Sequence, residues 1–266
     1  MPFYTSPLDG CQLHYVDHRP STPADTTLIF LHSWPMSSAM YAHLFLPLLS
    51  APTPLRLIAP DRRGFGKSEY TGCTPPADFS ISYDTFASDT LALLSHLDEP
   101  QHGGLGPFIF VAASMGCGES LLVYDLLRAP ACEKCKGFVW MGPSLPFPLA
   151  TPTNPRAPPR ELWDAIVAGL RDDRYAFTAA AVPGIFGSGV IEGCVVGEED
   201  LEAFEKIIAL ADPVAMERCI GIITGRDFTR ELEGMKGRVG GWEGGMGLLV
   251  LHGESDQSRC LICLEG

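Results

Sequence analysis

Ser114 lies at a position where its hydroxyl could be exposed as a nucleophile. Ser114 lies in the sequence Val-Ala-Ala-Ser-Met-Gly-Cys-Gly (residues 111–118), between a β-rich apolar run and a stretch with helical spacing. A sharp strand-to-helix turn requires small residues two positions before and two positions after the nucleophile, and Ala112 and Gly116 stand there. The turn would present the hydroxyl at the N-terminus of the helix, where negative charge is stabilised. We therefore predict a nucleophilic serine; the alternative is an ordinary strand-to-helix turn.

The residues around Ser114 resemble the nucleophile elbow of the α/β-hydrolase family, with Ala112 in place of the usual first glycine. A second segment, Leu-His-Ser-Trp-Pro (residues 31–35), resembles the His-Gly-X-Pro sequence of that family, with a serine in place of the glycine. The resemblance implies an oxyanion hole made by the backbone N–H groups of Trp34 and Met115.

A third segment, Asp-Arg-Arg-Gly-Phe-Gly-Lys-Ser (residues 61–68), resembles the Asp-x-Arg-Gly-x-Gly-x-Ser turn of the family. The role of this turn in the family is structural, so we expect no catalysis from Asp61. His32 is likewise expected to brace its loop. The double arginine and the segment 163–187 look most like the cofactor-free serine esterases that are also called non-heme chloroperoxidases.

The acid and the base of a catalytic triad are expected near the end of the chain. In the family an aspartate three residues after a strand-end glycine orients the catalytic histidine, and Asp256 matches that position after Gly253. Glu254 lies at a position that the family does not use, and His252 is expected to be a packed structural residue. The histidine should follow the acid, yet none of the seven histidines follows Asp256.

We therefore expect a truncated C-terminus that lacks the last strand, the last helix and the catalytic histidine. A serine without a base keeps its ordinary alcohol pKa and is a weak nucleophile. The sequence thus predicts the lineage of a serine hydrolase and a poor catalyst in this 266-residue chain.

Buried-strand patterns and helical patterns alternate along the chain. This alternation predicts an α/β fold with a doubly wound, mostly parallel sheet and a helical cap insertion. The expected division is a first part of the core over residues 1–141, a cap over 142–233 and a continued core over 234–266. The expected buried strands cover residues 27–31, 55–59, 108–112, 137–141 and 248–251, and a glycine-rich surface loop is expected over 234–247.

Composition excludes several classes of protein. Hydrophobic residues make up 46% of the chain, which is too many for a disordered protein, and no apolar run is long enough to cross a bilayer. The net charge of −13 argues against nucleic acid and anionic membranes as partners. Nine cysteines, an odd number, and the lack of a secretory signal indicate reduced thiols in the cytoplasm.

We expect neither a metal nor a cofactor. Two pairs of cysteines, Cys132/Cys135 and Cys260/Cys263, have the spacing of zinc ligands. Chance spacing in a cysteine-rich chain is the simpler interpretation. The sequence does not indicate an oligomeric state.

The function predicted from these features is hydrolysis of small esters or related acyl compounds by Ser114. The alternatives are a non-catalytic member of the fold that binds a ligand or partner, and a lactonase or carbon–carbon hydrolase that uses the same serine. Aromatic side chains are candidates to line an apolar substrate pocket, although they would serve equally as packing. These residues are Trp34, Phe147, Trp163, Phe177 and Phe186.

Overall fold

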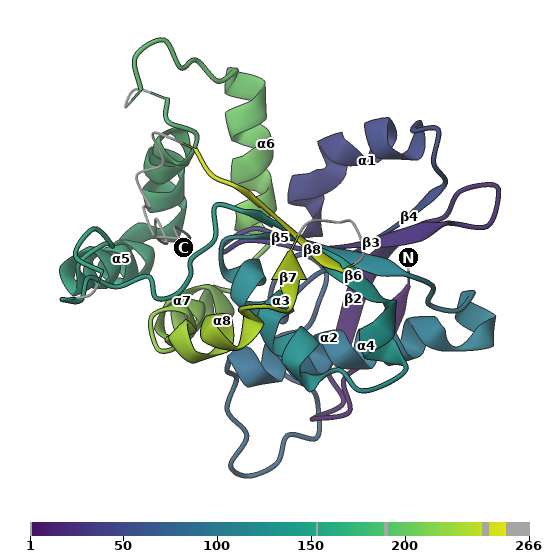
Figure 1. Cartoon of the computed structure of the whole chain (residues 1–266). Coiled ribbons are helices and arrows are strands. Elements are labelled where there is room, and N and C mark those ends of the chain that lie inside the picture. The colour runs from purple at the N-terminus through teal and green to yellow at the C-terminus, as the bar shows by residue number, and fades with distance from the viewer. Residues whose placement is uncertain (1, 153, 189–190, 241–244, 254–266) are drawn as a thin grey trace.

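The computed structural model describes residues 2–152, 154–188, 191–240 and 245–253. Its centre is an eight-stranded sheet with the strand order β1-β2-β4-β3-β5-β6-β8-β7 (Figure 1). The first two strands are antiparallel to their neighbours and the others run parallel. The strands are β1 (Phe3–Thr5), β2 (Gln12–His18), β3 (Thr26–Leu31), β4 (Leu55–Pro60), β5 (Phe108–Ala113), β6 (Cys135–Met141), β7 (Val239–Gly240) and β8 (Met246–Leu251). The predicted fold class is confirmed.

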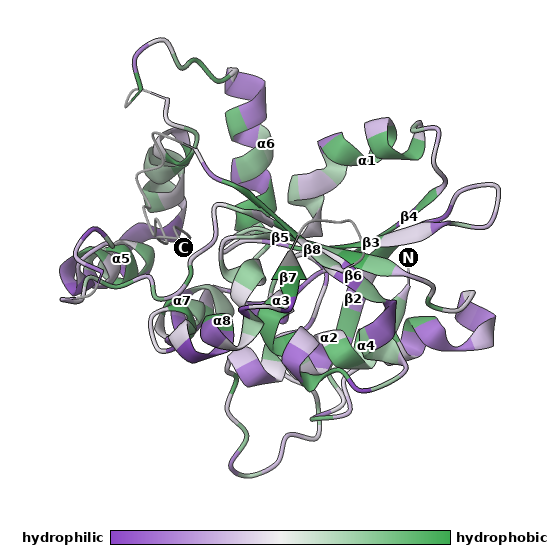
Figure 2. Ribbon diagram, in the orientation of Figure 1, coloured by the Kyte–Doolittle hydropathy of each residue, from purple (hydrophilic) through white to green (hydrophobic). Residues whose placement is uncertain are grey.

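The central strands are apolar because both faces of the sheet are covered. In β3, Ile29 and Leu31 belong to the larger hydrophobic cluster, whereas Phe30 between them belongs to a second cluster on the other face. Ile29 is opposite Ile58 of β4 and Phe110 of β5, and all three are fully buried. Figure 2 shows this apolar centre and the polar outer sides of the surrounding helices.

Helices cover both faces of the sheet. Tyr41 and Phe45 contribute to the smaller cluster, and α2 and α3 supply much of the larger one. Ser82 begins α2 with a capping box, because its side chain accepts from the Thr85 N–H while the Thr85 hydroxyl accepts from the Ser82 N–H. These helices are η1 (Ser38–Tyr41), α1 (Ala42–Leu49), α2 (Tyr83–Asp98), η2 (Pro100–His102), α3 (Met115–Leu126) and α4 (Ala131–Lys134).

A helical segment follows β6, after a proline-rich stretch without regular helix or strand. It contains α5 (Arg160–Ile185), α6 (Glu198–Ala209), α7 (Pro213–Ile223) and α8 (Thr229–Met235). The sequence predicts two helices over 162–170 and 174–182, and α5 contains both, separated by a kink at Asp173, whose φ of −148° and ψ of 97° are not helical. The Asp173 carboxylate accepts from the N–H groups of Tyr175 and Ala176, as an N-cap does.

The expected glycine-rich loop over 234–247 contains more structure than its composition indicated. Helix α8 runs into its first residues, and the two residues of β7 pair in parallel with the start of β8. A glycine-rich composition is typical of a loop, but pairing with an existing sheet overrides the local preference. In the described residues, no helix is long and apolar enough to cross a membrane.

Candidate active site

Ser114 has the strained backbone that a sharp strand-to-helix turn requires. Its φ is 51° and its ψ is −117°, and it is the one non-glycine residue with positive φ in the described part of the chain. Such a conformation costs on the order of 1–3 kcal/mol and persists only where the surrounding structure imposes it. The residue sits at the end of β5 and directly before α3, so its half-buried side chain lies at the carboxyl edge of the sheet.

The small residues beside Ser114 are needed because the chain is tightly packed there. A Cβ atom at Gly116 would lie 2.4 Å from the carbonyl oxygen of Leu31, at the end of β3. Ala112 is fully buried between its neighbouring strands. The sequence requirement for small side chains at these two positions therefore has a direct physical cause: β3 and α3 approach each other at the turn.

The Ser114 hydroxyl has a partner that sequence reasoning missed. Its Oγ lies 2.7 Å from the Oγ of Ser144, and the backbone N–H of Ser144 points to the Ser114 carbonyl at 3.4 Å. The N–H of Ser114 also donates to the carbonyl of Met141 at 3.0 Å. Strand β6 is next to β5, so the segment after β6 reaches the turn. That adjacency was the signal in the sequence that could have pointed to Ser144.

The two expected oxyanion donors lie on the segments that meet at this turn. Met115 is the first residue of α3, so its N–H has no acceptor within the helix. In the described part of the chain, the backbone N–H groups of Trp34 and Met115 donate to no protein acceptor. Trp34 follows the end of β3, whose Leu31 carbonyl packs on Gly116 of α3. Both N–H groups are thus available to a ligand.

Helix α7 contacts the residues on both segments that meet at the turn, Trp34 and Met115. The indole Nε1 of Trp34 donates to the carbonyl of Met216 at 2.9 Å. The sulfur of Met115 lies 3.6 Å from that of Cys219, and both residues are buried. A helix from the segment after β6 therefore contacts the two residues whose N–H groups are the expected oxyanion donors.

His32 is buried and holds the Trp34 loop in place. Its Nε2 accepts from the backbone N–H of Arg62 at 2.9 Å, so Nδ1 carries the hydrogen and donates to the Ser33 carbonyl at 2.8 Å. Burial, and next the charge of Arg62, lower the pKa of His32 from 6.5 to about 3. The imidazole is therefore neutral, and both of its nitrogens are engaged with backbone groups. It has the bracing role expected for it.

Asp61 is a structural anchor of the loop after β4. Its carboxylate accepts from Nδ1 of His14 at 2.7 Å and from the backbone N–H groups of Ser38 and Lys67 at 2.8 and 3.0 Å. Burial raises its pKa, but these hydrogen bonds outweigh burial and lower the pKa below its usual value. A Cβ atom at Gly66, where φ is 58°, would lie 2.4 Å from this carboxyl group, which explains the second glycine of the motif.

The double arginine forms two buried ion-pair groups. Arg62 donates through Nε to Glu119 of α3 at 2.9 Å, and Thr90 donates to the same carboxylate at 2.6 Å. Arg63, 1% exposed, pairs with Asp9 and Asp89. These guanidiniums connect the β4 loop to α2 and α3, and neither is directed at Ser114 in the hydrogen bonds of the described residues.

Asp256 lies outside the described residues, as do Glu254, Cys260 and Cys263. Strand β8, which precedes these residues, ends at the same carboxyl edge of the sheet as β6. Its Leu251 carbonyl accepts from the N–H of Gly142, directly after β6. All seven histidines are described, and none of them hydrogen-bonds the Ser114 hydroxyl, whose partner is Ser144. His252, at the end of β8, lies 3.1 Å through Nδ1 from the carbonyl of Gly253.

A comparison with protein families shows which family the chain belongs to. The sequence matches the alpha/beta hydrolase family over residues 28–259. The chain belongs to this family.

Relatives of this α/β-hydrolase chain include two curated proteins. A putative non-heme chloroperoxidase of Synechocystis is 29% identical over 235 residues, which is 88% of this chain and 75% of that protein. A non-heme chloroperoxidase of Kitasatospora aureofaciens is 28% identical over 257 residues, which is 97% of this chain and 82% of that protein.

Solved structures show the same fold. A bromoperoxidase from Bacillus anthracis superposes with a TM-score of 0.74 at 24% identity, covering 96% of this chain and 81% of that one. An esterase from Exiguobacterium antarcticum gives a TM-score of 0.72 at 20% identity, covering 87% and 76%.

Of the five aromatic candidates for a substrate pocket of this hydrolase, all but Phe147 pack against the larger hydrophobic cluster. All five are half-buried. Trp34 lies beside Ser114's turn, as described, whereas Phe186 packs on Phe204 of α6 at 4.6 Å between ring centroids. Trp163 donates through Nε1 to the carbonyl of Pro148 at 3.1 Å, and Phe177 packs within α5 near Gly169. Phe147 lies in the same proline-rich stretch and accepts from the Asn154 side chain through its carbonyl at 3.0 Å.

Cys132 and Cys135 are free thiols in the structure. Burial raises the pKa of Cys135 to about 12, so the thiol is neutral.

Proposed function

We propose that this α/β hydrolase cleaves small esters or related acyl compounds with Ser114 as the nucleophile. The observation that carries the proposal is the strained backbone of Ser114 at the N-terminus of α3, where the hydroxyl lies at the carboxyl edge of the sheet. This edge is where ligands bind in open α/β folds. The backbone of an ordinary strand-to-helix turn needs no such strain at a non-glycine residue.

In the proposed mechanism, the Ser114 oxygen attacks the carbonyl carbon of the ester and its proton passes to a base. The backbone N–H groups of Trp34 and Met115 hold the oxyanion of the tetrahedral intermediate, because both lack protein acceptors in the described residues. Collapse of the intermediate expels the alcohol, which takes the proton back from the base. Water then gives a proton to the base and attacks the acyl-enzyme, and the acid is released as Ser114 regains its proton. Asp256 is the proposed residue that orients the base.

The base determines how fast this chemistry runs. No histidine of the chain hydrogen-bonds Ser114, and none follows Asp256. The Ser144 hydroxyl cannot replace an imidazole, because an alcohol is not a base at neutral pH. We therefore propose that the 266-residue chain turns over slowly and that an imidazole delivered beside Ser114 raises the rate.

The helices of the segment 142–233 are proposed to act as the cap of the site. Helix α7 contacts both Trp34 and Met115, so it bounds the space into which Ser114 would receive an acyl group. The indole of Trp34 donates to the carbonyl of Met216 in this helix, and we propose Trp34 as a pocket residue together with α7. The other four candidates, Phe147, Trp163, Phe177 and Phe186, remain proposals.

The proposal is tested by hydrolysis of p-nitrophenyl acetate. Two proteins are compared: the 266-residue chain and the same chain extended by the C-terminal segment of a relative, called the extended chain below. We expect slow hydrolysis by the first and a large increase in the second. Ser114→Ala should abolish the increase, and Ser21→Ala, at an exposed loop position, should leave it unchanged. Full Ser114-dependent activity of the unextended chain would show that another residue is the base.

A second candidate function is non-catalytic binding of an ester-like ligand at the same site. Non-catalytic binding is favoured because, among the described residues, no histidine hydrogen-bonds the Ser114 hydroxyl. The extended chain separates the two functions. If it binds a short-chain ester analogue but does not hydrolyse p-nitrophenyl acetate above the rate of its Ser114→Ala variant, the site is a binding site.

A further inference from the structure

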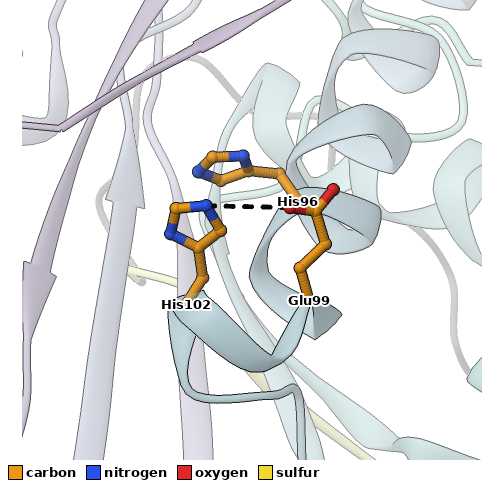
Figure 3. Close-up of side chains that lie close together, drawn as sticks. All are labelled: His96, Glu99 and His102. Carbon is orange, nitrogen blue, oxygen red and sulfur yellow. Dashed lines mark ion pairs between the residues drawn. The ribbon is translucent and has the colours of Figure 1, made fainter.

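Three side chains with metal-binding chemistry come together where α2 ends and η2 begins (Figure 3). His96, Glu99 and His102 lie three positions apart in the sequence, and their ligand atoms all lie within 4.8 Å of one another. The two imidazole rings are tilted relative to each other, with centroids 3.8 Å apart and planes inclined by 30°. The Glu99 carboxylate lies 3.8 Å from Nε2 of His102. This cluster has no part in the proposed hydrolysis.

We propose that His96, Glu99 and His102 form a binding site for one zinc ion. Two imidazoles and one carboxylate are ligands that zinc prefers, and water would complete a tetrahedral set. Zinc–nitrogen bonds of about 2.0 Å place neighbouring ligand atoms about 3.3 Å apart in a tetrahedron. The side chains of Glu99 and His102 are 50% and 31% exposed, so both have the freedom to close that small difference by rotation.

His96 is held in place by a residue outside the cluster. The hydroxyl of Tyr15 in β2 lies 3.1 Å from Nε2 of His96 and positions the ring from the sheet side. Outer partners of this kind commonly orient histidine ligands.

The charges around the site make Glu99 essential to it. Arg19 and Arg56 each donate to the backbone carbonyl of His102 at 2.9 Å, and both also pair with the Asp17 carboxylate. Two guanidiniums and one carboxylate leave one positive charge near the turn, which opposes binding of a cation. The Glu99 carboxylate offsets that charge, so the site should weaken sharply when Glu99 becomes neutral.

The position of the cluster assigns the ion a structural role. Residue 102 precedes the start of β5, whereas Ser114 follows its end. Strand β5, which lies between them in the chain, has six residues and spans roughly 17 Å from its first to its last residue at a rise of about 3.3 Å. An ion at this distance cannot touch a substrate on Ser114. It would join the last turn of α2 to η2, and because it binds only the folded arrangement it would raise the stability of the native state.

The experiment is a metal titration of the full chain, with Co²⁺ as a spectroscopic probe and Zn²⁺ for affinity and melting temperature. Co²⁺ distinguishes this site from the cysteines, because thiolate ligands give intense near-ultraviolet charge-transfer bands that imidazole and carboxylate ligands do not. We expect the first equivalent of Co²⁺ to bind without these bands, and Zn²⁺ to raise the melting temperature. Hydrolysis of p-nitrophenyl acetate should not change with this first equivalent.

The variants His102→Ala and Glu99→Gln should each weaken this binding at least tenfold and remove the shift in melting temperature. His102→Ala spares the two arginine contacts, which use the backbone carbonyl, and Glu99→Gln changes an exposed side chain without altering its shape. The matched control is His43→Ala, at an exposed position of α1, which should bind as the parent does. Unchanged binding in both site variants, a first equivalent ligated by thiolate, or no binding at millimolar metal would overturn the proposal.

Discussion

A single methyl group at Gly116 should separate the two segments that form the proposed oxyanion hole. In Gly116→Ala, the new Cβ would lie 2.4 Å from the Leu31 carbonyl oxygen and 3.1 Å from the Leu31 Cβ. Carbon–oxygen contacts in proteins are about 3.3 Å or longer, so β3 and α3 must move apart by about 1 Å. Leu31 begins the loop that carries Trp34, and Gly116 follows Met115 directly. The shift would therefore act on both N–H donors.

The expected effects on activity and stability differ in size. A misplacement of about 1 Å near reacting groups can lower the rate about 100-fold. Overpacking costs about 1–3 kcal/mol of unfolding free energy, and the gain in helix propensity from glycine to alanine, about 1 kcal/mol, offsets part of this. We therefore expect a large fall in kcat/KM for p-nitrophenyl acetate in the extended chain, with a modest loss of stability in urea.

The matched control is Gly221→Ala in α7, where a Cβ atom would meet no atom within 4 Å. This variant should keep its activity and gain up to about 1 kcal/mol in unfolding free energy. If Gly116→Ala retains kcat/KM within twofold of the parent while remaining folded, the oxyanion hole does not depend on the approach of β3 to α3, and the assignment of Trp34 and Met115 is wrong.

Three further predictions concern Ser144, Arg63 and His32. Ser144→Ala removes one neutral hydrogen bond to Ser114, which is worth about 0.5–1.5 kcal/mol. The kcat/KM of the extended chain should therefore fall between about twofold and tenfold, far less than with Ser114→Ala. A loss as complete as that of Ser114→Ala would show that Ser144 takes part in the chemistry. Arg63→Leu removes the ion-pair partner of two buried aspartates and should lower the free energy of unfolding in urea by about 3–5 kcal/mol. Arg171→Leu breaks an exposed ion pair and should have little effect. Equal effects of the two substitutions would refute this account. The pKa of His32 is lowered in the folded state, so on acidification the unfolded chain binds the proton first. The free energy of unfolding therefore falls as the pH drops from about 6.5 towards 3, by up to about 1.4 kcal/mol per pH unit. Urea unfolding between pH 6.5 and 5 should show a shallower decline in His32→Gln, and equal slopes would contradict the buried neutral imidazole.

The fold was predictable where burial on two faces produces continuous apolar runs. The segments that became β3 and β5 read as buried strands because no polar face is tolerated between two layers of helices. The two helices predicted over 162–170 and 174–182 are confirmed, because Asp173 between them has a non-helical backbone and its carboxylate caps the second helix. Strand β7 was not predictable, because its two residues are strand only where they lie beside β8.

The candidate site could be proposed from the sequence where its residues are nearly consecutive. Ser114 and its small neighbours, together with Trp34 and Met115, lie in short local sequences whose spacing reflects a tight turn. Ser144 escaped prediction because it is distant in sequence and meets Ser114 only through the adjacency of β5 and β6. The cluster at His96 escaped for another reason: its three residues cross the end of a helix, where a periodic pattern gives no shared face.

The most direct test of the central claim is covalent labelling of the nucleophile. The 266-residue chain and the extended chain are incubated with a fluorophosphonate, and the modified residue is found by peptide mass spectrometry. We predict a single phosphonylated residue, Ser114, with slow labelling of the first protein, faster labelling of the second and none in Ser114→Ala. Labelling at another serine, or equal labelling of Ser114→Ala, would contradict the account.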